Sequence, residues 1–189
     1  MNAYDFDETI YDGECSVEFF LYCFKYDPKL IKFLPDVLKA YMLYKKEKIS
    51  LDEMLNKYGK ELENYFSENK TQIDNLVKSF WDKRMGKIKP FYLKLQKEDD
   101  VIITASPRFL MQDICDRLGI ENLICTEFDL ETRKIEKLCF RESKVDCFRE
   151  KYPTKDIDDF YTDSMNDKFL MPFSKRVFLV KGNKIKQVK

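Results

Sequence analysis

Residues able to carry out phosphoryl chemistry occur in four groups along the chain. In order, they are Asp5, Asp7 and Thr9; then Thr104; then Lys144; and then Asp163 and Asp167. Two carboxylates two residues apart, where a strand gives way to a loop, allow one to attack phosphorus while the other acts as general acid and base. A hydroxyl and an ammonium group bind phosphoryl oxygens, and two further aspartates supply the oxygen ligands that Mg²⁺ prefers.

Each group also has an ordinary structural interpretation when it is taken alone. The first acidic run is typical of a turn, and Ser106, just after Thr104, is a normal helix cap. Lys144, at the expected start of a helix, is compatible with a solvated surface lysine, and Asp163 with an N-cap. The order of the four groups favours the catalytic interpretation, because each follows a strand or begins a helix and ligands bind at the carboxyl ends of parallel strands.

Several classes of enzyme are excluded by residues that the chain lacks. There is no histidine, which removes Ser-His-Asp and Cys-His catalysis, histidine-based zinc proteases and phosphohistidine chemistry. No cysteine is followed by arginine at the spacing of a Cys-x5-Arg phosphatase loop. With five glycines in all, the common glycine-rich nucleotide-binding loops are also missing. Catalysis must therefore come from carboxylates, lysine, hydroxyls, thiols or a metal held by oxygen.

The bulk composition indicates one compact domain, or one core with an inserted subdomain, in 189 residues. Lys and Arg number 34, as do Asp and Glu, and this zero net charge argues against a nucleic-acid partner. The sequence has no apolar run of membrane-spanning length, so neither membrane insertion nor secretion is expected. The six cysteines form no CxxC pair, and we expect reduced thiols in a cytoplasmic protein. A small phosphorylated metabolite is the expected partner, for a monomer or homodimer.

The elements that must position these residues change in character along the chain. After a short strand within residues 1–6, the pattern is helical from Ser16 to about Met85. Strands and helices alternate after residue 99, which indicates an α/β fold with a parallel sheet. The expected helices span 16–26, 27–46, 50–66, 71–84, 107–118 and 143–152, and the expected strands 101–104, 123–126, 157–162 and 176–180. Residues 127–140 are expected to form a hairpin, and 176–180 the final strand.

The ordered motifs resemble those of the haloacid dehalogenase (HAD) superfamily. Its first motif, DxDx[TV], matches Asp5, Asp7 and Thr9, and its second matches Thr104. The third, a lysine, matches Lys144, and the fourth, GDxxxD, matches Asp163 and Asp167. The helical block after the first motif looks like the C1 cap of the phosphoserine-phosphatase-like branch (subfamily IB). The resemblance implies a Rossmann-like core, mostly parallel with helices on both faces, over 1–13 and 86–189, and a helical cap over 14–85.

The resemblance also implies a mechanism for a Mg²⁺-dependent phosphomonoester phosphatase. Asp5 would be the nucleophile and form an aspartyl-phosphate, and Asp7 the general acid and base, with its pKa raised by Asp5. Thr104 and Lys144 would bind the phosphate. Mg²⁺ would be held by Asp5, the backbone carbonyl of Asp7, Asp163 and Asp167. Glu14 lies where phosphoserine phosphatases carry a substrate-contacting glutamate, and is a candidate for substrate specificity.

Three departures from the family pattern and three rival functions accompany this interpretation. Glu8 replaces a small residue, often glycine, Thr162 stands where glycine usually precedes the fourth motif, and only four residues precede Asp5. A phosphotransferase or phosphomutase on the same scaffold would pass the aspartyl-phosphate to an alcohol or a sugar. A phospho-receiver module would keep its aspartyl-phosphate, and the inserted helical block argues against it. A non-catalytic binding protein is the third rival function.

Overall fold

The computed structural model describes the chain apart from residues 27, 34, 36–38, 40–41, 44–69 and 130–133. The α-helices are α1 (Cys15–Cys23), α5 (Lys70–Arg84), α6 (Pro90–Leu95), α7 (Arg108–Leu118) and α8 (Ser143–Lys151). The strands are β1 (Ala3–Tyr4), β2 (Val101–Pro107), β3 (Asn122–Asp129), β4 (Lys134–Lys137), β5 (Ile157–Thr162), β6 (Ser174–Lys181) and β7 (Lys184–Gln187). Short 3-10 helices cover Pro28–Phe33, Met85–Lys87, Met165–Asp167 and Met171–Phe173.

The described strands form one seven-stranded sheet in the order β4-β3-β2-β1-β5-β6-β7. The five inner strands are parallel, and β4 and β7 pair antiparallel at the two edges. Although β1 has only two residues, it lies at the centre, where Ala3 pairs with Val101 of β2 and with Phe160 of β5. Asp5 extends this pairing, because its backbone N–H donates to the Tyr161 carbonyl at 2.9 Å. The nucleophile candidate therefore leaves the middle of the sheet.

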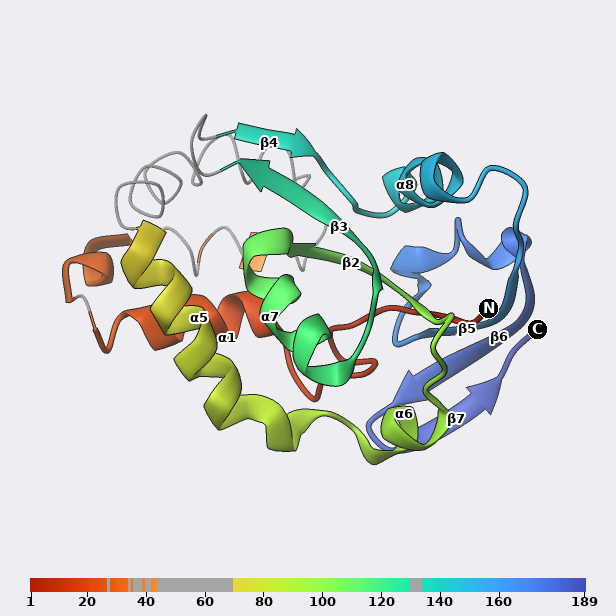
Figure 1. The fold of residues 1–189 in the computed structure, drawn as a ribbon, viewed down its shortest axis with the longest axis horizontal. Coiled ribbons are helices and arrows are strands. Elements are labelled where there is room, and N and C mark those ends of the chain that lie inside the picture. The colour runs from red at the N-terminus through yellow and green to blue at the C-terminus, as the bar shows by residue number, and fades with distance from the viewer. Residues whose placement is uncertain (27, 34, 36–38, 40–41, 44–69, 130–133) are drawn as a thin grey trace.

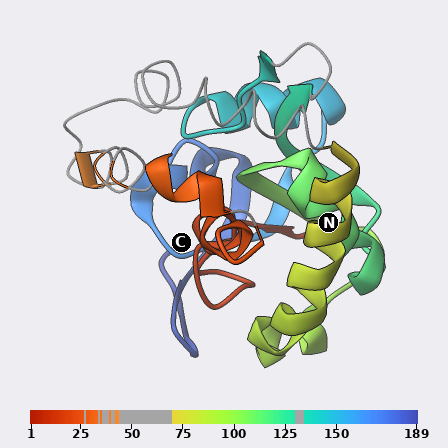
Figure 2. The same cartoon turned by 90° about the vertical axis from the view of Figure 1, so that its left-hand side faces the viewer.

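Apolar side chains alternate between the two faces of the sheet, as the period of a strand requires. Tyr4 and Ile102 pack in one buried cluster with α5 and α7, whereas Ala3, Val101 and Ile103 pack in another with Phe148 of α8. Helices therefore cover both faces. Figures 1 and 2 show α7 beside α5, with α8 apart from both. The expected α/β fold with a mostly parallel sheet is confirmed.

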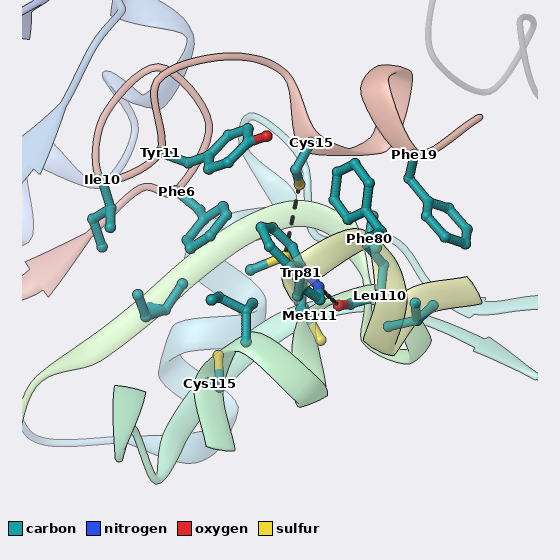
Figure 3. Close-up of a cluster of buried hydrophobic side chains, with 14 of the residues drawn as sticks. Phe6, Ile10, Tyr11, Cys15, Phe19, Phe80, Trp81, Leu110, Met111 and Cys115 are labelled. Carbon is teal, nitrogen blue, oxygen red and sulfur yellow. Dashed lines mark hydrogen bonds between the residues drawn. The ribbon is translucent and has the colours of Figure 1, made fainter. Parts of the chain in front are cut away.

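A cluster of aromatic rings joins the loop after β1 to the helices on one face (Figure 3). Trp81 of α5 meets Phe6 and Tyr11 edge to face, with ring centroids 5.9 and 5.5 Å apart. The Trp81 indole N–H also donates to the Leu110 carbonyl of α7 at 2.8 Å. All three rings are fully buried, and each such burial stabilises the fold by roughly 1.5–3 kcal/mol. The same cluster thereby holds the loop after β1 in place.

Two expectations about the α/β half are corrected by the structure. Residues 176–180 lie in β6, but this is not the final strand, because β7 follows as an antiparallel edge strand. Strand β2 runs on to Pro107, and α7 begins only at Arg108. Ser106 makes no side-chain cap, since its hydroxyl donates to the Asp7 carboxylate instead. Gly119, which ends α7, adopts a left-handed conformation with φ 67°.

The helices expected near both ends of the inserted block agree with α1 and α5. In the segment expected to be a helix over 27–46, a 3-10 helix covers Pro28–Phe33, and most of the remainder lies outside the described residues. The helix expected over 50–66 lies wholly outside them. The division into a core of 1–13 and 86–189 and a cap of 14–85 therefore stays a prediction. The hairpin expected over 127–140 is confirmed by the antiparallel pairing of β3 with β4.

Candidate active site

One pocket of about 200 Å³ brings together the residues selected from the sequence. Its lining includes seven of the eight residues selected from the sequence: Asp5, Asp7, Glu14, Thr104, Lys144, Asp163 and Asp167. The lining is completed by Glu8, Ala105, Phe140, Arg141, Ser164 and Asn166. Because β1, β2 and β5 are parallel neighbours, the segments that follow them meet at the carboxyl edge of the sheet. The parallel topology thus joins residues more than 150 positions apart.

Lys144 lies between two aspartates in the lining of the pocket. Its ammonium group is 2.8 Å from Asp5 Oδ1 and 2.7 Å from Asp167 Oδ1, and all three residues are at most 8% exposed. Burial raises the pKa of Asp5, while Lys144 acts in the opposite direction. The two carboxylates outweigh burial for Lys144 and hold its pKa above the ordinary lysine value. Lys144 is therefore a buried cation of the site, and the surface-lysine interpretation is wrong.

Asp167 is held from its other side by Thr162. The Thr162 hydroxyl donates to Asp167 Oδ2 at 2.9 Å, while Asp167 Oδ1 contacts Lys144. A glycine at position 162, as in the family pattern, has no hydroxyl to make this bond. Thr162, which departs from the family pattern, therefore gives Asp167 a further hydrogen-bond donor. By holding Asp167, it also helps to position Lys144.

Asp7 is bound by groups from α1 and β2. Its Oδ1 accepts the backbone N–H of Cys15, the first residue of α1, at 2.6 Å. Its Oδ2 accepts the Ser106 hydroxyl at 2.9 Å. Burial raises the pKa of Asp7 to about 6, and the neighbouring charge that adds to this is Glu14. The predicted direction of the shift is therefore right, but its predicted cause, the charge of Asp5, is not the main one.

The remaining predicted residues border the pocket in different ways. Thr104 is 1% exposed, and its Oγ1 accepts the Ser106 N–H at 3.1 Å, which orients the hydroxyl group. Asp163 is partly exposed, and burial raises its pKa. Glu14 immediately precedes α1, so it sits at the junction between the core and the predicted cap. Thr9 does not line the pocket, but its hydroxyl lies 3.4 Å from Asp5 Oδ2.

Two side chains that the sequence pattern does not single out take part in the site. Ser106 has the pattern of a helix cap, yet its hydroxyl binds Asp7 and also lies 2.8 Å from the Ser16 hydroxyl. Arg141 lines the pocket three residues before Lys144 and has a positive φ of 48°. Arg141 lies in the turn before α8, close in the sequence to the predicted Lys144, and this closeness is the feature by which it could have been selected as a site residue. The only other non-glycine residue with positive φ in the described part of the chain is Glu8, which also lines the pocket.

Glu8 should make the fold less stable than a glycine would. Its φ of 56° is in the left-handed region, which costs an L-residue about 1–2 kcal/mol, partly offset by the entropy that glycine loses on folding. Glu8→Gly is therefore expected to raise the free energy of unfolding by about 0.5–1 kcal/mol in urea titrations. Glu8→Gln removes the charge but keeps Cβ, and should give no such gain. An equal gain in the free energy of unfolding in both variants would mean that the charge of Glu8, and not its backbone conformation, lowers the stability.

The donor set in the pocket fits Mg²⁺ by its chemistry. Asp5, Asp7, Asp163 and Asp167 supply only oxygen ligands, which a hard divalent cation prefers. Burial raises the pKa of Asp5, Asp7 and Asp163. The pocket therefore holds an excess of carboxylates that a divalent cation would neutralise. Within the described residues, no three His, Cys, Asp or Glu side chains converge closely enough to hold an ion as they are placed. These side chains therefore define no coordination geometry as they are placed.

Fold and site together define an α/β protein with an aspartate-centred pocket at the carboxyl edge of a parallel sheet. The model of the haloacid dehalogenase-like hydrolase family matches residues 3–171. The chain thus belongs to the haloacid dehalogenase superfamily and is a hydrolase of that family, which confirms the resemblance found in the motifs. A comparison with functionally curated proteins gives no match.

Three solved structures are similar to this chain in fold. A protein of unknown function from Bordetella pertussis Tohama I has a TM-score of 0.75 at 15% identity, over 94% of this chain and 87% of that chain. A phosphoserine phosphohydrolase-like protein from Francisella tularensis subsp. tularensis SCHU S4 has a TM-score of 0.61 at 16% identity, over 94% and 86%. A HAD family hydrolase, t0658, from Salmonella enterica subsp. enterica serovar Typhi has a TM-score of 0.56 at 10% identity, over 91% and 59%. The second agrees in fold with the predicted phosphoserine-phosphatase-like branch.

Two further expectations concern the chain as a whole. The six cysteines are all buried, and none of them is paired in a disulfide. No helix in the part of the chain that the structure describes has the length and apolar character needed to cross a bilayer.

Proposed function

We propose that this protein is a Mg²⁺-dependent phosphatase that hydrolyses a small phosphomonoester through an aspartyl-phosphate. The observation that carries the proposal is the position of Asp5, which leaves the central strand with its carboxylate 2.8 Å from the Lys144 ammonium. Asp7, two residues later, lines the same pocket. A buried carboxylate beside a fixed cation can receive a phosphoryl group, because the cation offsets its repulsion from the phosphate oxygens.

Four residues of the pocket act on the phosphoryl group in this mechanism. Asp5 attacks phosphorus, and Asp7 protonates the leaving oxygen and then takes a proton from the water that hydrolyses the aspartyl-phosphate. The raised pKa of Asp7, about 6, suits a group that must both give and accept a proton. Thr104 and Lys144 bind the non-bridging oxygens of the phosphoryl group.

The carboxylate-rich side of the pocket is assigned to the metal. Asp5, the backbone carbonyl of Asp7, and Asp163 would hold Mg²⁺, with Asp167 binding directly or through water. When bound, Mg²⁺ offsets the repulsion between the anionic nucleophile and the phosphate. Asp167 already contacts Lys144 and Thr162, so positioning Lys144 is a second role for it.

The substrate is assigned only as a class. Glu14 lines the pocket at the start of α1, where it can face the leaving group. A small phosphorylated metabolite fits a pocket of about 200 Å³. The superfamily assignment and the fold of the phosphoserine phosphohydrolase-like neighbour support this class. The free buried thiols support a cytoplasmic, reducing location, and we propose a monomer or homodimer.

Removal of the metal should abolish phosphate release. The test uses an aryl phosphate and a panel of small phosphomonoesters, assayed for inorganic phosphate with Mg²⁺, with a chelator, and with Mg²⁺ restored. We expect turnover with Mg²⁺ to fall at least about 100-fold on chelation, since the loss of one electrostatic contact to the reacting group has an effect of this size. Recovery of turnover when Mg²⁺ is added back would show that the chelator had not unfolded the protein.

The same assay separates the phosphatase from its three rival functions. Aspartyl-phosphate formation with phosphate transfer only when an alcohol or sugar is added would identify a phosphotransferase or phosphomutase. A long-lived aspartyl-phosphate without turnover would identify a receiver-like module. Absence of both products from every compound, with Mg²⁺ present, would favour a binding protein and contradict the proposal.

A further inference from the structure

Glu18, in the first turn of α1, is a carboxylate that the proposed mechanism does not use. The Tyr11 hydroxyl donates to its Oε2 at 2.9 Å, and Arg84 Nε donates to the same oxygen at 3.1 Å. The Lys87 ammonium group donates to Oε1. Burial acts to raise the pKa of Glu18, but Lys87 and Tyr11 outweigh it and hold the pKa below its ordinary value. Glu18 is therefore an anion with three fixed partners.

The partners of Glu18 come from two other segments of the chain. Tyr11 belongs to the loop after β1, whereas Arg84 ends α5 and Lys87 ends the 3-10 helix that follows. These two segments are joined directly, because the Asp12 N–H donates to the Lys87 carbonyl at 2.9 Å. The Lys87 ammonium group also lies 4.8 Å from the centroid of the Tyr11 ring. Glu18 thus fastens the start of α1 to the loop after β1 and to the end of α5.

Gly13 leaves room for this ion pair against the backbone of the loop. Its φ is 142°, and a Cβ atom at this position would lie 2.7 Å from Lys87 Nζ and still closer to Glu18 Oε1. Both separations are shorter than a van der Waals contact of a carbon atom, so a larger residue would displace the ion pair. The Gly13 carbonyl also accepts the Glu8 N–H at 3.0 Å. The Glu18–Lys87 pair is therefore packed directly against the loop that carries Asp7.

The start of α1 supplies two groups to the catalytic pocket. The Cys15 N–H donates to Asp7 Oδ1 at 2.6 Å, and Glu14 lines the pocket. The Glu18 N–H donates to the Glu14 carbonyl at 2.9 Å, so Glu18 belongs to the same helical turn. Hydrogen bonding within a turn fixes the backbone dihedrals of its residues. The contacts that hold the Glu18 side chain therefore also fix the position of the N–H group that binds Asp7.

We propose that Glu18 is a positioning residue that orients the general acid Asp7 through the first turn of α1. This role rests on the proposed phosphatase function, and Glu18 acts through Asp7 and not on the substrate. Without the carboxylate, its three donors lose their common acceptor and the start of α1 can shift. A shift of the Cys15 N–H removes one of the hydrogen bonds that hold the Asp7 carboxylate, and leaves the one from the Ser106 hydroxyl. Asp7 is then less well placed to protonate the leaving oxygen.

Glu18→Gln, assayed with an aryl phosphate and an alkyl phosphate, provides the test. Glutamine keeps the size of the side chain but removes its charge. The rate of aspartyl-phosphate formation is measured in single turnovers with saturating Mg²⁺. We expect this rate to fall at least about tenfold for the alkyl phosphate but only about twofold for the aryl phosphate, whose leaving group needs little protonation. A smaller fraction of folded protein would lower both rates alike, so a change in their ratio identifies an effect on Asp7.

Further variants show whether the effect passes through the ion pair. Lys87→Met removes one donor and keeps Glu18, so it should lower the alkyl-to-aryl ratio by a smaller factor. Glu18→Gln/Lys87→Met should lower the ratio no further than Glu18→Gln, because the two residues are in contact and act together. Glu127→Gln is the matched control, since Glu127 is bound by Arg108 at 2.5 Å but lines a separate cavity, and it should leave the ratio unchanged. Circular dichroism checks that each variant is folded.

The outcomes distinguish the role of Glu18 from the phosphatase function. An active wild type with the same alkyl-to-aryl ratio as Glu18→Gln would overturn the positioning role and leave the phosphatase function standing. A fall in the ratio that Glu127→Gln reproduces would also overturn it. Absence of aspartyl-phosphate from the wild type with both substrates would instead overturn the phosphatase function, and the role of Glu18 with it.

Discussion

Asp5→Asn is expected to lower phosphate release at least about 10⁴-fold while leaving the fold intact. Loss of a nucleophile removes the covalent route, and only the contribution of binding and of the remaining electrostatic contacts is left. The amide has the size of the carboxylate, and its oxygen can still accept from Lys144, now 2.8 Å from Asp5 Oδ1. The substitution also removes one of two buried carboxylates that share a single ammonium group. The variant's midpoint in thermal unfolding should therefore equal or exceed that of the wild type.

Asp7→Asn is the matched control for this prediction. Its amide keeps an oxygen for the Ser106 hydroxyl or the Cys15 N–H but cannot donate a proton as an acid does. An aryl phosphate, whose leaving group needs little protonation, should still phosphorylate Asp5, whereas alkyl phosphates should react at least 100-fold more slowly. Phosphate release and trapping of the aspartyl-phosphate, measured with both substrate types, test the two roles. Full activity of Asp5→Asn would remove Asp5 from the mechanism.

Much of the fold and the membership of the site could be predicted from the sequence. The run Val101–Thr104 is apolar and short, so it was recognisable as a buried parallel strand, and Ile157–Thr162 was also expected to be a strand. Parallel strands deliver their carboxyl ends to one edge, and this placed Asp5, Thr104 and Asp163 in one pocket. The order of these residues along the chain was sufficient, because a parallel sheet brings the residues that follow neighbouring strands together at one edge.

The detailed contacts could not be predicted, because they depend on burial and on partners distant in the sequence. Ser106 has the pattern of a helix cap, and only the approach of the loop after β1 gives it Asp7 as a partner instead. The pKa of Asp7 is governed by burial, which the spacing of two carboxylates does not reveal. All four residues of β7 are exposed and two of them are lysines, so no apolar pattern marks the strand.

Lys144→Met is expected to lower the free energy of unfolding by about 3–5 kcal/mol and to abolish phosphate release. The variant leaves the carboxylates of Asp5 and Asp167 buried within a few ångströms of one another and without their cation. Thr9 and Thr162 hydroxyls remain near them, but neutral donors do not offset two negative charges. Urea titration in the absence of Mg²⁺ measures the loss. Mg²⁺ should restore part of it, because a ligand that binds only the folded protein stabilises it.

Replacing Asp5 and Asp167 as well tests whether their uncompensated charges cause the loss of stability in Lys144→Met. In Asp5→Asn/Lys144→Met/Asp167→Asn all three charges are absent, so the loss should be well below that of Lys144→Met alone, and Mg²⁺ should have little effect. The three residues are in contact, so their single-site effects are not expected to add, and the difference measures their coupling. Equal losses in the single and triple variants would mean that Lys144 stabilises the fold through the packing of its chain. The buried cation would then matter for phosphate binding but not for offsetting the charges of the nucleophile Asp5 and of Asp167.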